Sequence, residues 1–292
     1  MKKYLLHKLK KRILRPQIKR RGEQILRWNQ ETPLAYGLNT QERDTKIVLS
    51  LTSFPKRFAT LHICLKSLLN QTVKADKIIV WLGPDVQESD ITEEMRSLEQ
   101  YGVEYVFVPL DLKPHKKYYY AMQKYSDAVI ITVDDDVVYE ADTVETLMET
   151  HRKYPRAVCA RRVHYITMED QQILPYNEWK LECRDVKSPS FRLIPTGVGG
   201  VLYPPHLLYQ DIFDIEKIQA LCLNADDIWL KWMELLADVP VVWTPCLMTL
   251  PPMIASAQEV ALFKSNVNQN LNDECISRLL NAYPEVMKNL RR

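Results

Sequence analysis

Glycine is unusually scarce in this sequence. Only 7 of the 292 residues are glycine, whereas glycine makes up about 7% of an average protein. No run of about 18 apolar residues is present, and cations interrupt the apolar residues near the N-terminus, which argues against a membrane-spanning helix and against a secretory signal. The six cysteines include no CxxC pair, and no histidine stands at zinc-finger spacing, so a zinc site is disfavoured. We therefore expect a cytoplasmic protein whose cysteines are reduced and mostly buried.

Acidic residues are missing between Met1 and Arg21, a stretch that carries ten lysines and arginines. Apolar residues recur there at roughly helical spacing. This pattern is typical of a helix on an anionic membrane surface, where each cation contributes up to about 1 kcal/mol. A solvated basic tail, or a helix packed on the body of the protein, fits it equally well. Nucleic-acid binding is disfavoured, because no second basic stripe with aromatic residues follows.

We therefore expect a basic amphipathic segment over residues 1–44, in peripheral contact with the inner face of the plasma membrane. A single domain should follow over residues 45–292. From residue 46 onward, short buried strands alternate with helices, which predicts a Rossmann-like α/β fold with a mostly parallel central sheet and flanking helices. Strands are expected at 47–52, 78–82, 103–108 and 128–133, and helices at 58–69, 92–100, 116–125 and 142–154.

The second half of the sequence is less regular. Residues 226–236 are predicted to form an amphipathic helix that buries Trp229 and Trp232 and turns Lys231 and Glu234 toward solvent. Loops or a hairpin are expected at 165–190, strands at 157–161, 200–203 and 240–243, and a late helix at 272–282.

Three consecutive carboxylates, Asp134, Asp135 and Asp136, directly follow the strand at 128–133. In open α/β sheets, ligands bind at the carboxyl ends of the strands. Adjacent carboxylates raise each other's pKa unless a cation neutralises them. Oxygen ligands suit Mg²⁺ or Mn²⁺, which commonly bridge protein carboxylates and substrate phosphates. We therefore predict a divalent-metal site here, against the alternative of a solvated acidic turn that caps a helix.

Three of the seven glycines fall close together, at Gly197, Gly199 and Gly200. Glycine permits tight bends and close approach of the backbone to a ligand, so we expect a loop that faces the donor or the acceptor. An ordinary loop is the alternative. The spacing is not that of a phosphate-binding GxGxxG, because no clear strand-to-helix turn accompanies it.

Two further segments carry groups suited to transfer chemistry. Asp226 and Asp227 open a predicted helix directly after Asn224 and Ala225. Asn224 is itself able to cap that helix, so one carboxylate is spare and can act as a general base. Lys117 lies among cations and tyrosines upstream of the acidic triplet, where a lysine can neutralise a diphosphate. An exposed cationic face of a helix is the alternative for that segment.

In this order, these segments resemble the type-A fold glycosyltransferases, in particular the small bacterial capsule and lipopolysaccharide glycosyltransferases and, more distantly, the exostosin-type transferases. The matching segments are 50–57, 116–119, 134–136, 196–205 and 225–230, and the likeness runs from about residue 46 to the C-terminus. The resemblance implies transfer of a sugar from a nucleotide-sugar, a UDP-sugar, to a glycan or lipid-linked glycan of the bacterial surface. A nucleotide-binding half over 45–140 and an acceptor-side half over 141–292 are expected.

The resemblance also implies a role for each matching residue. The donor would contact Thr52, Ser53, Arg57, Lys117, Asp134 and Asp135, the metal would bind Asp136 and Asp134, the acceptor side would include Gly199, Gly200 and Asp226, and Asp227 would be the catalytic base.

One departure concerns the third metal ligand, which many type-A enzymes take from a late histidine. The last histidine here is His206, so water, donor phosphate or a late aspartate such as Asp273 would complete the shell. Two other functions remain open. One is a haloacid-dehalogenase-like phosphatase, because residues 134–138 loosely fit its nucleophile loop, and the other is a non-catalytic glycan- or membrane-binding protein.

Overall fold

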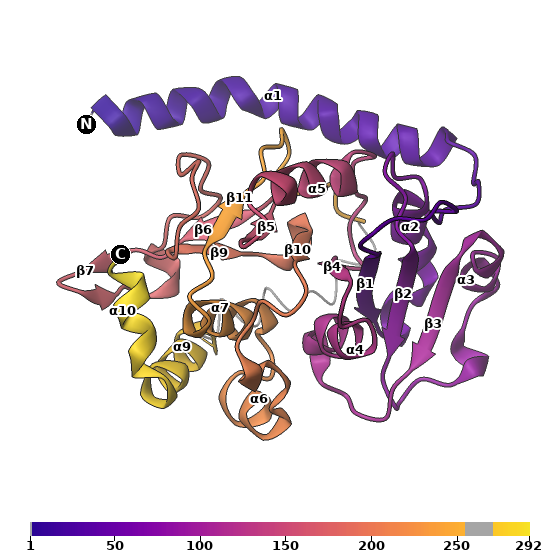
Figure 1. Cartoon of the computed structure of the whole chain (residues 1–292). Coiled ribbons are helices and arrows are strands. Elements are labelled where there is room, and N and C mark those ends of the chain that lie inside the picture. Colours follow the sequence, from indigo (N-terminus) through magenta and orange to yellow (C-terminus); the bar gives the residue numbers. More distant parts are fainter. Residues whose placement is uncertain (1, 255–270) are drawn as a thin grey trace.

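The computed structural model describes residues 2–254 and 271–292, with side chains from residue 16 onward. At the centre of this part of the chain lies a seven-stranded sheet with the order β11-β5-β10-β4-β1-β2-β3 (Figure 1). β10 is antiparallel to both of its neighbours, and the other neighbouring strands are parallel. The prediction of a mostly parallel α/β sheet is confirmed. The strands are β1 (Ile47–Ser53), β2 (Lys77–Leu82), β3 (Val103–Phe107), β4 (Val129–Thr132), β5 (Val158–Ala160), β10 (Val201–Tyr203) and β11 (Val241–Trp243).

Helices connect and cover these strands. The helices expected at 58–69 and 226–236 have those bounds, as α2 and α7, whereas the one expected at 92–100 is a short α3 followed by a 3-10 turn. The chain turns there at Gly102, whose φ of 110° ends the segment before β3. The helices are α1 (Lys2–Glu31), α2 (Phe58–Leu69), α3 (Glu93–Arg96), α4 (Lys116–Lys124), α5 (Thr143–Lys153), α6 (Ile215–Leu221), α7 (Asp226–Leu236), α9 (Leu271–Ala282) and α10 (Met287–Leu290).

Two small antiparallel pairs stand beside the main sheet. One joins β6 (Val163–Tyr165) to β9 (Leu193–Pro195), and the other joins β7 (Met168–Glu169) to β8 (Gln172–Ile173). The second pair is the hairpin expected within residues 165–190.

Side chains of the central strands alternate between two sides of the sheet. Leu49 and Leu51 of β1 pack with α2 and α5, on the side along which α1 also runs (Figure 1), whereas Val48 packs with Ala121 of α4. Further along the sheet, α7 packs with side chains of β5, β10 and β11. Both faces are therefore buried, which explains why the parallel strands are apolar throughout.

The order of the strands reverses at β1. β2 and β3 follow on one side of β1, and β4 pairs with its other side. Because β1 and β4 are parallel, their carboxyl ends lie at the same edge of the sheet. Ligand-binding crevices form where the strand order reverses in this way. The residues that follow β1 and β4 are thus brought together.

Helix α1 is held against the body of the protein by its C-terminal part. Ile25 is buried in the main core, and the Asn29 side-chain amide donates to the carbonyl of Ile63 in α2 at 3.0 Å. The Arg21 guanidinium donates to Glu140 at 2.8 Å. Across the part of the chain that the structure describes, no helix is both long enough and apolar enough to cross a bilayer.

The prediction that Lys231 and Glu234 face solvent is wrong. Both side chains are fully buried, and Lys231 Nζ lies 3.0 Å from Glu234 Oε2. The reason is that α7 packs against the sheet on one side and against α9 on another, so it has no solvated face at this point.

The expectation that all cysteines are reduced is also wrong. Cys222, which follows α6, forms a disulfide with Cys275 of α9 across a sequence separation of 53 residues. The remaining four cysteines are free. Sequence spacing gave no sign of this pair, because the two residues meet only through the packing of α9 beside the end of α6.

We predict that Lys231→Met lowers the free energy of unfolding by about 3–5 kcal/mol, because it leaves the Glu234 carboxylate buried without its partner. Burial raises the pKa of Glu234 to about 7 even with Lys231 present. A group whose pKa is higher in the folded than in the unfolded protein stabilises the fold at pH values below its unfolded pKa. This contribution is lost as the pH rises through the folded pKa. The loss in the variant should therefore be larger at pH 8 than at pH 6, as measured by urea unfolding.

The control is the double variant Lys231→Met/Glu234→Leu, which removes both charges. Its free energy of unfolding should lie within about 1 kcal/mol of that of the wild type. A single variant as stable as the wild type at pH 8 would contradict the prediction.

Candidate active site

The acidic triplet lies directly after β4, beside the residues that follow β1. Asp135 and Asp136 are 4% and 7% exposed, whereas the Asp134 side chain is 30% exposed. Three carboxylates at the carboxyl end of a central strand, two of them buried, require cations nearby. Two such cations are present, one from each side of the triplet.

Arg57 is the first of these cations. It closes the 3-10 turn Pro55–Arg57 after β1, and its guanidinium pairs with Asp135 and, at 3.2 Å, with Asp136. The Ser53 hydroxyl donates to the second oxygen of Asp135 at 2.5 Å. The Asp135 carboxylate is thus fully engaged within the protein, and its contacts fix the loop that carries its two neighbours.

Lys117 is the second cation, and it connects two elements. Its ammonium lies 2.8 Å from Asp134 Oδ1 and 3.0 Å from Asp226 Oδ2 at the start of α7. The lysine is itself positioned through its backbone, because its carbonyl accepts from the Ser50 hydroxyl, and Ser50 in turn accepts from the Trp81 indole at 2.8 Å.

His115 positions the start of α7 relative to α4. One ring nitrogen lies 2.9 Å from the Tyr118 hydroxyl, and the other lies 2.9 Å from the carbonyl of Cys222. Burial lowers the pKa of His115 to about 4, so the ring is neutral at pH 7. The neutral ring therefore bridges α4 and the loop before Asp226 through two hydrogen bonds.

Asp227 is oriented by the glycine loop. The backbone N–H of Gly197 donates to both carboxylate oxygens of Asp227, at 3.0 and 3.2 Å. A methyl group at position 197 would lie 2.7 Å from Lys117 Nζ, 3.1 Å from Asp134 Oδ1 and 3.4 Å from Asp227 Oδ1. The missing side chain of Gly197 is therefore what lets these three charged groups approach one point.

Glycine is needed at the other two positions of the loop for different structural reasons. A side chain at Gly199 would collide with Arg162, at 2.6 Å from its Cβ and 2.8 Å from its backbone nitrogen, and Gly200 has a φ of +87°. These constraints shape the loop that presents Gly197. Any contact of Gly199 or Gly200 with an acceptor stays a prediction.

Among the described residues, the cluster holds more carboxylates than cations. Five aspartates, residues 134–136, 226 and 227, lie around Arg57 and Lys117. Burial, then repulsion from Asp134, raises the pKa of Asp136 to about 6. Burial, then the neighbouring Asp226, raises the pKa of Asp227 well above that of an ordinary aspartate. Both groups are therefore poised to bind a cation or to accept a proton.

The available oxygen ligands suit Mg²⁺ or Mn²⁺ whose coordination is completed by water and phosphate, rather than an ion held by protein ligands alone. No three His, Cys, Asp or Glu side chains converge as a preformed metal site within residues 16–254 and 271–292. Asp134 and Asp136 can supply two oxygens, and Mg²⁺ typically takes one or two carboxylates, with water and substrate phosphate completing the shell. Asp273, one candidate for a further ligand, lies on α9, where it accepts from the Tyr176 backbone N–H at 2.7 Å.

Most of the predicted site residues converge in this cluster. Thr52 is an exception, because its hydroxyl donates to the carbonyl of Trp81 at 2.8 Å. Sequence reasoning missed the parts played by Ser50, His115 and Gly197. The clustering of glycines was a usable signal for the last of these, whereas the contacts of Ser50 and His115 had no signal in the sequence. The converging residues are Ser53, Arg57, Lys117, Asp134, Asp135, Asp136, Asp226 and Asp227.

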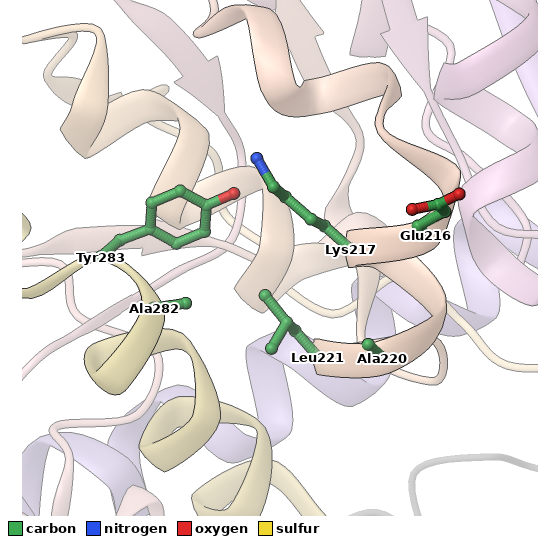
Figure 2. Close-up of a pocket in the computed structure, with 6 residues that line it drawn as sticks. All are labelled: Glu216, Lys217, Ala220, Leu221, Ala282 and Tyr283. Atoms are coloured by element: carbon green, nitrogen blue, oxygen red, sulfur yellow. The ribbon is translucent and has the colours of Figure 1, made fainter.

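A separate hollow of about 400 Å³ lies between α6 and the end of α9 (Figure 2). Its one cation, Lys217, pairs with Asp211 at 2.6 Å and with Asp214 at 3.3 Å. Tyr283 donates its hydroxyl to the same Asp211. Lys217 and Tyr283 are thus engaged with neighbouring aspartates that do not belong to the aspartate cluster of the candidate site.

Comparison with known proteins identifies a family for this chain. The family model described as glycosyl transferase family 2 matches residues 53–202, from the end of β1 to β10. No curated protein sequence matches.

Solved structures resemble the chain at low identity. Mannosyltransferase PcManGT from Pyrobaculum calidifontis, in complex with GDP-Man and Mn²⁺, is 10% identical, with a TM-score of 0.44 over 91% of this chain and 78% of that chain. An apo UDP-glucose pyrophosphorylase is 9% identical, with a TM-score of 0.37 over 68% of this chain and 89% of that chain.

We predict that Gly197→Ala destabilises the protein by about 1–3 kcal/mol, because the added methyl must displace the Lys117 ammonium from its ion pairs. Gly22→Ala is the matched control. In the interior of α1, its methyl would meet only Met248 and Pro252, at 3.7 and 3.8 Å, so it should be neutral or stabilising by about 0.5–1 kcal/mol. Urea unfolding of both variants tests this, and equal stabilities would count against the crowding at position 197.

Proposed function

Because the chain belongs to glycosyl transferase family 2, we propose that it transfers a sugar from a nucleoside-diphosphate sugar to a glycan of the bacterial surface with the help of Mn²⁺ or Mg²⁺. Membership of the family establishes a glycosyltransferase that uses a nucleotide-sugar, and it replaces the phosphatase and non-catalytic alternatives. UDP as the nucleotide and a capsule or lipopolysaccharide acceptor are proposed from the resemblance of the motifs. Residues 45–140 would form the nucleotide-binding half, and residues 141–292 the acceptor side.

The observation that carries the proposal is the overcharged aspartate cluster at the point where the strand order reverses. Asp134 and Asp136 would hold the divalent ion. When bound, such an ion neutralises the charge that develops on the diphosphate leaving group. Asp135 stays engaged with Ser53 and Arg57 and keeps its two neighbours in place.

Lys117 is suited to bind the donor diphosphate. A lysine ammonium has three hydrogen-bond donors. One donates to Asp134 Oδ1 at 2.8 Å, and Asp226 Oδ2 lies 3.0 Å away as an ion-pair partner. A further donor is suited to a phosphate oxygen. Burial first lowers the pKa of Lys117, but attraction from Asp134, Asp226 and Asp227 outweighs that effect and raises it well above its usual value. Lys117 therefore stays charged while the leaving group departs.

Asp227 is suited to accept the proton of the acceptor hydroxyl. A general base works best when its pKa lies near the pH of the reaction, and the pKa of Asp227 is shifted upward from the ordinary aspartate value. The two hydrogen bonds from Gly197 orient the carboxylate. Asp227 and the donor-binding Lys117 are linked through Asp226, so the base lies beside the phosphate site.

We predict that Mn²⁺ strengthens UDP binding at least about tenfold at pH 7.5, as measured by isothermal titration. The gain should fall as the pH drops through about 6, because the pKa of Asp136 is about 6 and a protonated carboxyl no longer binds a metal. Asp136→Asn should remove the gain at every pH. Asp142→Asn is the matched control, because Asp142 instead pairs with Arg161 at 3.0 Å.

The same titration on Asp227→Asn separates binding from catalysis. This variant should keep metal-dependent nucleotide binding while losing about 10²–10⁴-fold in transfer rate. If neither UDP nor GDP binds more tightly with Mn²⁺ than without it, the proposed metal site is wrong.

We also propose that α1 contacts an anionic membrane. Its C-terminal part is anchored to the body through Ile25 and Asn29, while Lys19, Arg20 and Arg27 are exposed and Leu26 is 43% exposed. Together with the ten cations up to Arg21, this leaves a basic helix fixed along one side of the molecule (Figure 1). Such a helix would keep the enzyme near lipid-linked acceptors.

We expect the protein to co-sediment with vesicles that contain roughly 30 mol% phosphatidylserine. This binding should be lost at about 0.5 M salt, because salt screens the attraction between the cations and the anionic lipids. Replacing Lys8, Lys10, Lys11 and Arg12 by glutamate should abolish binding without changing metal-dependent UDP affinity. Equal binding to vesicles of neutral phosphatidylcholine would rule out the electrostatic contact.

A further inference from the structure

A second hollow lies on the acceptor side of the fold, between the segment after β8 and the outer face of α9. It has a volume of about 560 Å³, within the range of about 300–1,000 Å³ typical of small-molecule sites. We name it the α9 pocket. Its lining residues are Ile173, Leu174, Pro175, Asn177, Glu178, Asp273, Ile276, Ser277, Leu280 and Asn281.

The chemistry of the lining is mixed in a specific way. Half of these side chains are aliphatic, and the other half are amides, a hydroxyl and carboxylates. Amides and carboxylates accept hydrogen bonds from hydroxyl groups, and the amides and the hydroxyl also donate them. The apolar surface suits C–H groups. A polyhydroxylated ring offers both kinds of group at once.

The lining also has a charge preference. Glu178 and Asp273 are acidic, and no lysine, arginine or histidine is among the described residues that form the pocket. Like charges brought together at an interface cost several kcal/mol. A ligand with a carboxylate, sulfate or phosphate at this position is therefore disfavoured relative to an uncharged one.

Tyr176 connects the α9 pocket to the aspartate cluster. Its backbone N–H donates to Asp273 at the pocket rim, while its ring packs against Trp179 at 4.8 Å between centroids. The ring also lies edge-on to the ring of His164, at 6.2 Å between centroids.

Contacts continue from His164 to the aspartate cluster. His164 Nε2 lies 3.5 Å from the guanidinium of Arg162, which donates to the Thr196 hydroxyl at 2.8 Å. Thr196 precedes Gly197, whose N–H donates to Asp227. The pocket rim and Asp227 are therefore joined by a chain of side-chain and backbone contacts.

We infer that the α9 pocket is an acceptor subsite that holds an uncharged sugar unit of the glycan, next to the unit that receives the new sugar. The inference rests on the proposed transfer function and specifies its acceptor: a chain with neutral sugars at the position that occupies the pocket. The subsite lies between the η5 turn (Tyr176–Glu178) and α9, elements that the family match at 53–202 covers only in part.

The test is binding to an immobilised array of neutral and acidic oligosaccharides. Ser277→Trp places a large side chain in the pocket from an exposed position on α9. Ala220→Trp is the matched control, because it makes the same kind of change in the separate hollow of Figure 2. We expect the wild type to bind uncharged glycans, Ser277→Trp to bind them at least about tenfold more weakly, and Ala220→Trp to bind as the wild type does.

Asn281→Ala is a milder second variant. It removes one amide without adding volume and should weaken binding by about three- to tenfold, in line with one lost hydrogen bond of about 1 kcal/mol. Binding mainly to acidic glycans, binding of no neutral glycan, or wild-type binding by Ser277→Trp would overturn the inference.

Nucleotide titration keeps this result separate from the proposed function. Ser277→Trp should retain metal-dependent UDP binding, because the pocket residues do not contact the aspartate cluster directly. A wild type without metal-dependent nucleotide binding would refute the transfer function on its own, whatever the array shows.

Discussion

The ammonium of Lys117 joins the two parts of the site. It pairs with Asp134 after β4 and with Asp226 at the start of α7, two elements that are almost a hundred residues apart and lie in different hydrophobic clusters. Buried carboxylates in such number would otherwise repel one another. The lysine is held from behind by Ser50 and Trp81 of the central strands. The position of Asp227, the proposed base, relative to the acidic triplet is therefore linked to one cation supported by the central strands.

Sparse use of glycine becomes meaningful in this setting. Gly197 supplies the space in which Lys117, Asp134 and Asp227 converge, and its N–H orients the last of them. Gly199 and Gly200 shape the same loop through close packing and a left-handed backbone. The loop is thus required by the charged cluster as much as by any ligand.

The basic helix is coupled to the same region by a short chain of contacts. Arg21 of α1 pairs with Glu140, and Glu140 also pairs with the buried Arg161 beside β5. Glu140 lies four residues beyond Asp136 and is itself 5% exposed. A helix proposed to contact lipid is in this way attached to the segment that follows the acidic triplet.

The sequence alone determined the alternation of strands and helices, the bounds of α2 and α7, the acidic triplet after a buried strand and the family resemblance, because these are local patterns of hydrophobicity, charge and spacing. It could not predict that Lys231 and Glu234 would be buried together or that Cys222 would bond to Cys275, because both depend on α9 packing against α7 and the end of α6. Nor did it give the specific roles of Ser50, His115 and Gly197 within the site. Their roles arise from distances between elements, and only the folded sheet and its covering helices set those distances.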